Sequence, residues 1–142
     1  MPTLTLELFP KKYLVCRFSP ETQAANIWLP MEGFWSLTRT PDEVSLVMEE
    51  GNVLPARAVV EEDWRMFRVA GKLEFELVGI LAELSSVLAV ADVSIFVIST
   101  YDTDYLLVKA DQLIEALTIL KKAHYQIVEW QPESVILDSP AT

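Results

Sequence analysis

Two hydrophobic periods alternate along the second half of the chain, and this alternation restricts the fold more than any other feature of the sequence. Four short segments are rich in β-branched and aromatic residues, as strands are; they are residues 64–70, 92–99, 105–109 and 126–130. Two longer segments, residues 74–91 and 111–122, repeat apolar side chains every three or four positions, as helices do. The order is strand, helix, strand, strand, helix, strand.

Two strand–helix–strand crossovers in this order give one antiparallel four-stranded sheet with both helices on the same face, because such crossovers are right-handed. The second half is therefore predicted to be a ferredoxin-like α+β unit. Segment 92–99 is apolar on nearly both faces, so we expect it to be a central, covered strand. Gly79 falls inside the expected helix, where glycine costs about 1 kcal/mol relative to alanine. That cost favours close packing of Gly79 against a neighbouring helix.

The first half is shorter and less regular. Four segments have the alternation or composition of strands; they are residues 3–9, 13–18, 34–40 and 44–49. Between the second and third we expect a short helix from Ser19 to about Trp28, because serine caps a helix and Pro20 fits its first position. We expect residues 51–63 to form an irregular connection and strand 3–9 to fill the missing edge of this abbreviated half.

The two halves also resemble each other weakly. Residues 40–47 align with residues 100–108 if one gap is allowed. A pair of related units would meet about a local two-fold axis and leave a cleft for a small ligand. We therefore divide the chain into a first unit of residues 1–60, a second unit of residues 61–131 and a tail of residues 132–142.

The balance of charge and the single cysteine exclude several classes of function. A net charge of −10, from 21 acidic and 11 basic residues, disfavours binding to nucleic acid and to anionic membranes. The apolar stretch 78–99 is interrupted by Glu83 and Asp92, so it is better interpreted as a helix and a strand than as a membrane span. Cys16 has no partner for a disulfide, and the sequence does not open like a secretory signal. We expect a cytoplasmic protein.

Catalytic and metal-binding patterns are lacking in the sequence. His124 is the only histidine, and its place at a helix end favours a structural role. One histidine and one cysteine do not make a zinc site, and the glycines follow neither a phosphate-loop nor a dinucleotide spacing. We therefore expect no catalytic residue, no metal site, no cofactor and no enzymatic activity.

The residues of three segments resemble those of a known family. Residues 71–81, which begin with Gly71-Lys72-Leu73-Glu74, and residues 95–108, which contain Ser99-Thr100-Tyr101-Asp102-Thr103-Asp104-Tyr105, look like the corresponding parts of small bacterial tandem ACT proteins. The pattern is also similar to the Castor arginine sensors of animals and to the ACT regions of aspartate kinases. Residues 34–47 resemble the first hairpin of that family.

The resemblance implies two ferredoxin-like ACT (βαββαβ) units, of which the first is abbreviated. Each unit would have an antiparallel sheet with its helices on one face. The resemblance also implies that an amino acid binds at the interface between the units. Carried over by position, Gly71 and Glu74 lie in the turn after the first strand, and Thr100, Tyr101 and Asp104 in the hairpin loop. Ser36 and Leu37 of the first hairpin would face them.

These residue types suit a free amino acid. An ammonium group prefers a carboxylate, which Asp104 and Glu74 offer. A carboxylate prefers unobstructed N–H groups, which a glycine turn such as that at Gly71 supplies before a helix. Hydroxyl groups of Ser99, Thr100 or Thr103 could complete the site. The structural alternatives are that Gly71 only ends a strand and that Asp104 only stabilises its own turn.

Two functions follow from these interpretations. The first is an allosteric regulatory module that binds a free amino acid or similar small metabolite. The alternative is a protein–protein interaction module that binds no ligand and forms a homodimer through exposed sheet edges. The two are distinguished by whether an amino acid stabilises the protein and whether removal of the Asp104 carboxylate abolishes that effect.

Overall fold

The computed structural model describes residues 4–51, 54–70 and 79–132. In the first half the elements are β1 (Thr5–Leu8), β2 (Tyr13–Phe18), the short 3₁₀ turn η1 (Ala24–Asn26), β3 (Trp35–Arg39) and β4 (Val44–Glu49). In the second half they are β5 (Val59–Val69), α1 (Ile80–Val90), β6 (Phe96–Ser99), β7 (Asp104–Lys109), the 3₁₀ turn η3 (Ala110–Gln112), α2 (Leu113–Lys122) and β8 (Gln126–Glu129). The predicted α+β class is confirmed.

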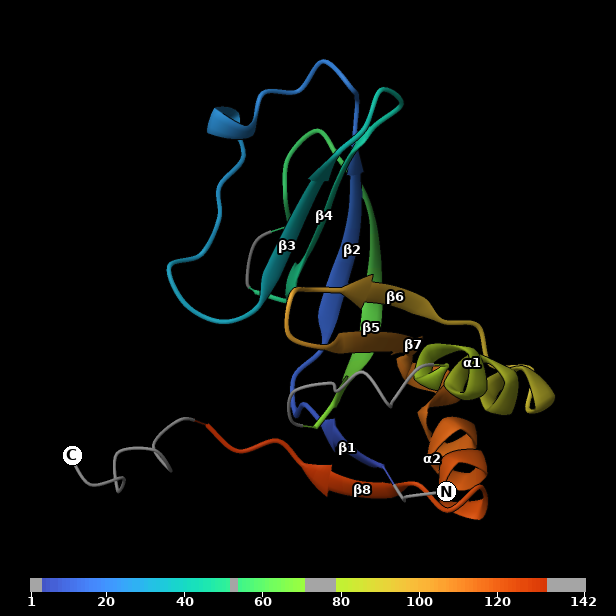
Figure 1. The fold of residues 1–142 in the computed structure, drawn as a ribbon. Coiled ribbons are helices and arrows are strands. Elements are labelled where there is room, and N and C mark those ends of the chain that lie inside the picture. The colour runs from blue at the N-terminus through green and yellow to red at the C-terminus, as the bar shows by residue number, and fades with distance from the viewer. Residues whose placement is uncertain (1–3, 52–53, 71–78, 133–142) are drawn as a thin grey trace.

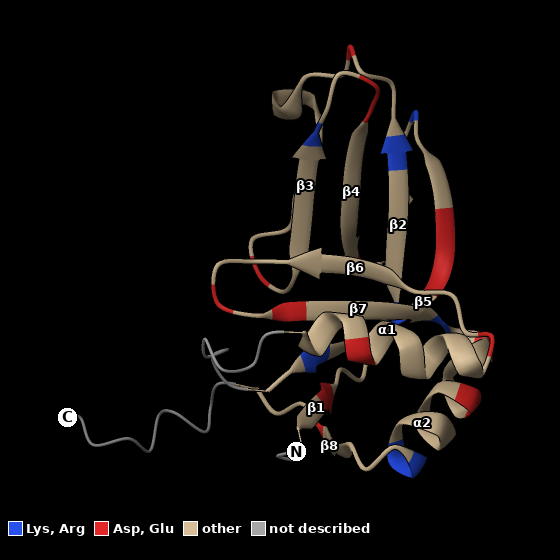
Figure 2. Cartoon of the chain, turned by 45° about the vertical axis from the view of Figure 1, so that its right-hand side comes forward, with Lys and Arg blue, Asp and Glu red and all other residues tan. Residues whose placement is uncertain are grey.

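β5 belongs to two parts of the sheet at once. Its first residues pair with β2 in the order β3-β4-β2-β5, and its last residues lie between β7 and β1 in the order β6-β7-β5-β1-β8. Figures 1 and 2 show the result: β6 and β7 run across the face of β3, β4 and β2, and the two helices lie beside the second part only. The seam between the parts therefore holds side chains from both halves of the chain.

A β-bulge bends β5 where it passes from one part to the other. Tyr13 pairs with Trp64 but Val15 pairs with Glu61, so β5 carries one extra residue. Asp63 within this bulge has a φ of 65°. Its N–H donates to a carboxylate oxygen of Glu50 at 2.8 Å. Bulges increase local twist, and this one redirects β5 into the second part of the sheet.

The buried apolar side chains of the described residues form three clusters. The first lies between the second part of the sheet and the helices and includes Leu6, Phe67, Leu84 and Leu120. A second covers the outer face of β2 and β4, and the third lies between the two crossing parts of the sheet, around Tyr13, Trp64, Met66 and Leu107. Burial on both faces explains why so much of this sheet is apolar.

Both helices end in the same hydrogen-bonded motif. After α1, Asp92 has a φ of 61°, its N–H donates to Ala89 and the next N–H, of Val93, donates to Leu88. His124 takes the same place after α2, with a φ of 74°. This is a Schellman motif, in which glycine is the favoured residue at the left-handed position.

The placement of β1 corrects the sequence prediction. We expected strand 3–9 to complete the first half, but β1 pairs antiparallel with β5 and parallel with β8, in the second part of the sheet. The physical reason is burial: Leu6 is 1% exposed and packs into the cluster beneath the helices. An alternating strand identifies a buried face but not the sheet that it joins.

β6 is also misplaced by the sequence prediction. Segment 92–99 was expected to be central, yet in the described part of the chain β6 pairs only with β7. Val97 packs toward the helices, whereas Phe96 and Ile98 pack into the cluster between the crossing parts of the sheet. The part of the sheet formed by β3, β4 and β2 lies across β6. Both faces of this edge strand are therefore covered, which explains why both are apolar.

Two further predictions are wrong. The helix expected from Ser19 is only the turn η1, because the guanidinium of Arg39 binds the carbonyl groups of Pro20 and Thr22 that a helix would use internally. Gly79 is not packed inside a helix: it is the N-cap of α1, with a φ of 88° and open space around an added Cβ. Its positive φ, not crowding, calls for glycine.

No helix in the described part of the chain is long and apolar enough to cross a membrane.

Candidate functional site

The loop between β6 and β7 is closed by hydrogen bonds between its own side chains and main chain. The Ser99 hydroxyl donates to Oδ1 of Asp104 at 2.6 Å, and these two residues are also register partners in the hairpin. The N–H of Thr100 donates to the carbonyl of Thr103 at 2.9 Å. The Asp104 carboxylate is therefore held at the base of a tight turn, and among the described residues no donor meets its Oδ2.

Thr103 fixes this loop to the end of β5. Its side chain is only 6% exposed, and its hydroxyl donates to the main-chain carbonyl of Val69 at 2.9 Å. Val69 stands two residues before Gly71 in the sequence. Gly71 and Glu74 themselves lie outside the described residues.

A groove of about 350 Å³ separates the first hairpin from β6. Ser36, Thr38 and Ser45 line it from β3 and β4, and Ser99 lines it from the end of β6. The structure thus brings together two of the residues expected at the site, Ser36 and Ser99, although 63 positions separate them in sequence.

Two other expected residues point elsewhere. Leu37 lies between Ser36 and Thr38 on the opposite face of β3 and packs against the cluster on the outer face of the sheet. Tyr101, at the tip of the loop, is 99% exposed and contributes nothing to packing. An aromatic ring left entirely in water is free to cover a ligand or to meet another protein.

The side chains that line this groove are hydrogen-bonding groups suited to holding a small molecule. The groove offers several hydroxyl groups and one carboxylate, Glu43, which lies 3.9 Å from the guanidinium of Arg17. Among the described residues there is no group of three histidine, cysteine or acidic side chains that could hold a metal ion. Hydroxyl and carboxylate groups around an open groove suit a small polar molecule with hydrogen-bond donors.

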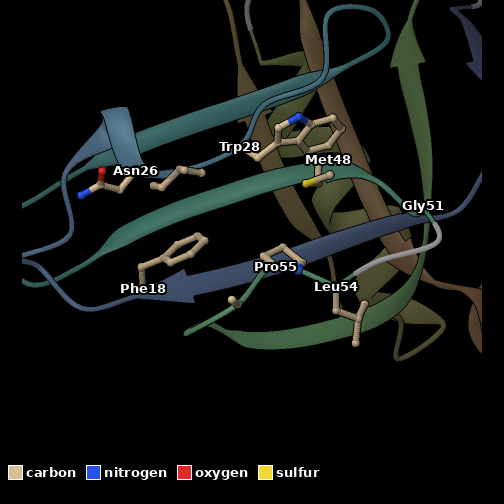
Figure 3. Close-up of a pocket in the computed structure, with 9 residues that line it drawn as sticks. Phe18, Asn26, Trp28, Met48, Gly51, Leu54 and Pro55 are labelled. Carbon is tan, nitrogen blue, oxygen red and sulfur yellow. The ribbon is translucent and has the colours of Figure 1, made fainter.

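An apolar pocket of about 500 Å³ lies on the outer face of β2 and β4, and the sequence did not indicate it. Figure 3 shows Phe18 and Met48 on the strands, with Trp28 from the loop after η1 and Leu54 and Pro55 from the segment before β5. In the second unit helices cover the equivalent kind of face. The short first half of the sequence could have indicated this pocket, because a sheet without long helices on one face leaves that face partly open.

Comparison with known proteins points to one family. The model of the ACT domain matches residues 59–122, from the start of β5 to the end of α2. The rat cytosolic arginine sensor for mTORC1 subunit 1 is 36% identical over 72 residues, which are 50% of this chain and 22% of the sensor. The chain therefore spans about a fifth of the length of that curated relative.

Two solved structures share the fold over nearly the whole chain. Protein Atu0741 from Agobacterium tumefaciens is 30% identical, with a TM-score of 0.82 over 93% of this chain and 97% of that one. The regulatory subunit of aspartate kinase from Thermus thermophilus is 10% identical, with a TM-score of 0.55 over 83% of this chain and 95% of that one. The second likeness concerns the fold alone.

Proposed function

Since the chain belongs to the ACT-domain family, we propose that it is a cytoplasmic regulatory module that binds a free amino acid or similar small metabolite, and that it is not an enzyme. The observation that carries this proposal is the position of Asp104. Its carboxylate accepts a hydrogen bond from Ser99, which lines the groove between the first hairpin and β6, and Thr103 anchors the same loop to the end of β5.

In this proposal Asp104 receives the ammonium group. Ser99 occupies Oδ1, and a ligand ammonium would donate to Oδ2 in a charge-assisted hydrogen bond. Glu74, three residues beyond Gly71, would add a second negative charge. The main-chain N–H groups that follow β5, starting at Gly71, would hold the ligand carboxylate, because glycine puts no side chain in the way.

The remaining residues have supporting roles. The hydroxyls of Ser36 and Thr100 are the further partners that we assign to the ligand, and Tyr101 would close over it. Thr103 supports the loop through its bond to Val69. Leu37 stabilises the hairpin that carries Ser36 from the opposite face of β3.

The relatives support a sensing role. The rat protein with 36% identity is by name an arginine sensor, and the aspartate kinase chain with the same fold is by name a regulatory subunit. A negatively charged chain with an acidic site would favour a ligand that carries positive charge. We therefore place basic amino acids first among the candidates.

The alternative function, dimerisation without a ligand, is favoured by the outer surface of the helices. Val90 of α1 is 80% exposed and Ile114 of α2 is 76% exposed. Solvent-exposed apolar side chains on the helical layer suit contact with a second copy of the chain. A homodimer and a ligand site are compatible, so light scattering with and without amino acids should be measured on the same sample.

A thermal-shift experiment tests the proposal. The melting temperature is measured with each of the common amino acids at millimolar concentration, for the natural chain and for the Asp104→Ala and Asp102→Ala variants. We expect at least one amino acid to raise the melting temperature in proportion to the logarithm of its concentration, with the effect lost in Asp104→Ala and kept in Asp102→Ala. No shift with any amino acid would leave only the dimerisation module.

A further inference from the structure

A cavity of about 560 Å³ lies where the two crossing parts of the sheet meet, apart from the groove and from the apolar pocket described above. It is separate from the groove of the proposed site, because no residue lines both. Its walls are largely aromatic: Phe9 follows β1, Tyr13 is on β2, Phe34 precedes β3, Tyr105 is on β7 and Trp130 follows β8. Segments from both units therefore build it.

Four of these rings form a closed circuit. The centroids of Phe9 and Tyr13 are 6.5 Å apart, those of Tyr13 and Phe34 6.2 Å, and those of Phe34 and Tyr105 4.9 Å. Tyr105 and Phe9, 6.5 Å apart, complete the circuit, and Trp130 stacks on Phe9 at 4.7 Å. Aromatic side chains in these orientations favour a flat aromatic ligand, because its ring can form both edge-to-face and stacked contacts with them.

One polar group at this cavity has no partner. Tyr13 is fully buried, and its hydroxyl makes no hydrogen bond within the described part of the chain. A buried hydroxyl without a partner is costly, so such groups usually meet a water molecule or a ligand. Burial, together with the nearby Glu49 carboxylate, raises the pKa of Tyr13, which keeps the hydroxyl protonated and able both to donate and to accept.

Three of the four charged side chains that line the cavity, Lys11, Glu49 and Arg68, are already paired, and Glu32 is the fourth. Lys11 lies 3.2 Å from Glu49, and Arg68 lies 2.6 Å from Glu7. Gly33 makes room for the Glu49 carboxylate of the first pair: its φ is 84°, and a Cβ there would come within 2.7 Å of that carboxylate. The same carboxylate accepts a hydrogen bond from the N–H of Phe34 at 3.4 Å. A ligand with net charge would have to compete with these pairs.

We propose that this cavity is a binding site for a flat aromatic molecule without net charge that carries one hydrogen-bonding group on its edge. The ring would lie against Phe9, Phe34 and Tyr105, and the edge group would bond to the Tyr13 hydroxyl. A cation is disfavoured because the guanidinium of Arg68 already stands 5.9 Å from the centre of the Phe9 ring. This site is independent of the amino-acid site, so either can exist without the other.

Three small probes with the same ring and different charge test the assignment: benzyl alcohol, benzoate and benzylammonium. Binding is followed by calorimetry or by chemical-shift changes on the full chain at neutral pH. We expect benzyl alcohol to bind with a dissociation constant in the millimolar range or below, at least fivefold more tightly than either ion. Tighter binding of an ion, or no binding of benzyl alcohol at 20 mM, would overturn the proposal.

Variants locate the binding. Tyr13→Phe removes only the hydroxyl, and we expect it to weaken benzyl alcohol binding about three- to tenfold, which is the usual worth of one hydrogen bond. Trp130→Leu, which removes a ring at the rim, should weaken it as well and serves if Tyr13→Phe folds poorly. Trp28→Ala, in the apolar pocket of Figure 3, and Asp104→Ala should leave it unchanged. An unchanged affinity in both cavity variants would place the probe elsewhere and refute the site.

Discussion

The hydroxyl of Thr103 donates a buried hydrogen bond of 2.9 Å to the main-chain carbonyl of Val69. This contact joins the β6–β7 loop, which carries Asp104, to the end of β5, which leads toward Gly71. The two segments from which we build the amino-acid site are thus connected by one side chain. The contact makes Thr103 a positioning residue for the proposed site.

Thr103→Val tests that connection. Valine keeps the volume but leaves the buried carbonyl of Val69 without its donor, so we expect a loss of about 1–2 kcal/mol in the free energy of unfolding, measured with urea. Thr118→Val, which removes an exposed hydroxyl that bonds within α2, should change stability by less than about 0.5 kcal/mol. Equal effects of the two variants would show that the Thr103 bond does not hold the loop.

Gly79→Ala should destabilise the protein although nothing surrounds the new methyl group. Gly79 has a φ of 88°, which costs an L residue about 1–2 kcal/mol. Gly51 also has open space around it, but its φ is not positive, so Gly51→Ala should be neutral or stabilise by up to about 1 kcal/mol. Chemical denaturation of both variants separates the effect of a positive φ from that of steric crowding. If both variants lost stability, the positive φ of Gly79 would not explain its destabilisation.

His124→Gly should stabilise the protein. His124 holds the left-handed position after α2, where glycine is favoured, so we expect a gain of about 1 kcal/mol and a higher melting temperature. Lys122→Gly, in the last turn of the same helix, should have the opposite sign, because glycine there costs about 0.5–1 kcal/mol. A loss of stability in His124→Gly would mean that the histidine side chain makes a contribution of its own.

Cys16 should react with thiol reagents only when the protein unfolds. It is 1% exposed, and burial raises the pKa of its thiol from 9.0 to about 11. Because the folded state holds the proton more tightly, the corresponding stability is present below pH 9 and is lost as the pH rises through about 11. Labelling with a chromogenic disulfide at pH 8, with and without denaturant, measures the protection. Rapid labelling of the folded protein would contradict it.

The order of the strands and helices from β5 to β8 was predicted well because local and global signals agree there. The helical periods of the segments that became α1 and α2 match the faces that the structure buries, at Leu84 and Leu88 and at Ala116 and Leu120. The partner of β1 could not be predicted, since Leu6 pairs with Val69 more than 60 residues away and alternation carries no information about the partner strand.

The first unit and the cavities were less accessible to sequence reasoning. Nothing local marks Arg39 as the residue that binds the carbonyls of Pro20 and Thr22 and so keeps that segment from forming a helix. The loop around Asp104 was identified because its polar residues are consecutive in the sequence. The aromatic cavity was not, because Phe9, Phe34, Tyr105 and Trp130 come together only in the fold.

The most direct measurement is a calorimetric titration of the amino acid that most raises the melting temperature into the natural chain and into Asp104→Asn and Asp102→Asn. Asparagine keeps the shape of the side chain and removes only its charge. The account predicts that Asp104→Asn weakens binding at least tenfold, the loss of one charge-assisted hydrogen bond, while Asp102→Asn binds as the natural chain does. Equal affinity in all three proteins would show that no ammonium group is held at Asp104.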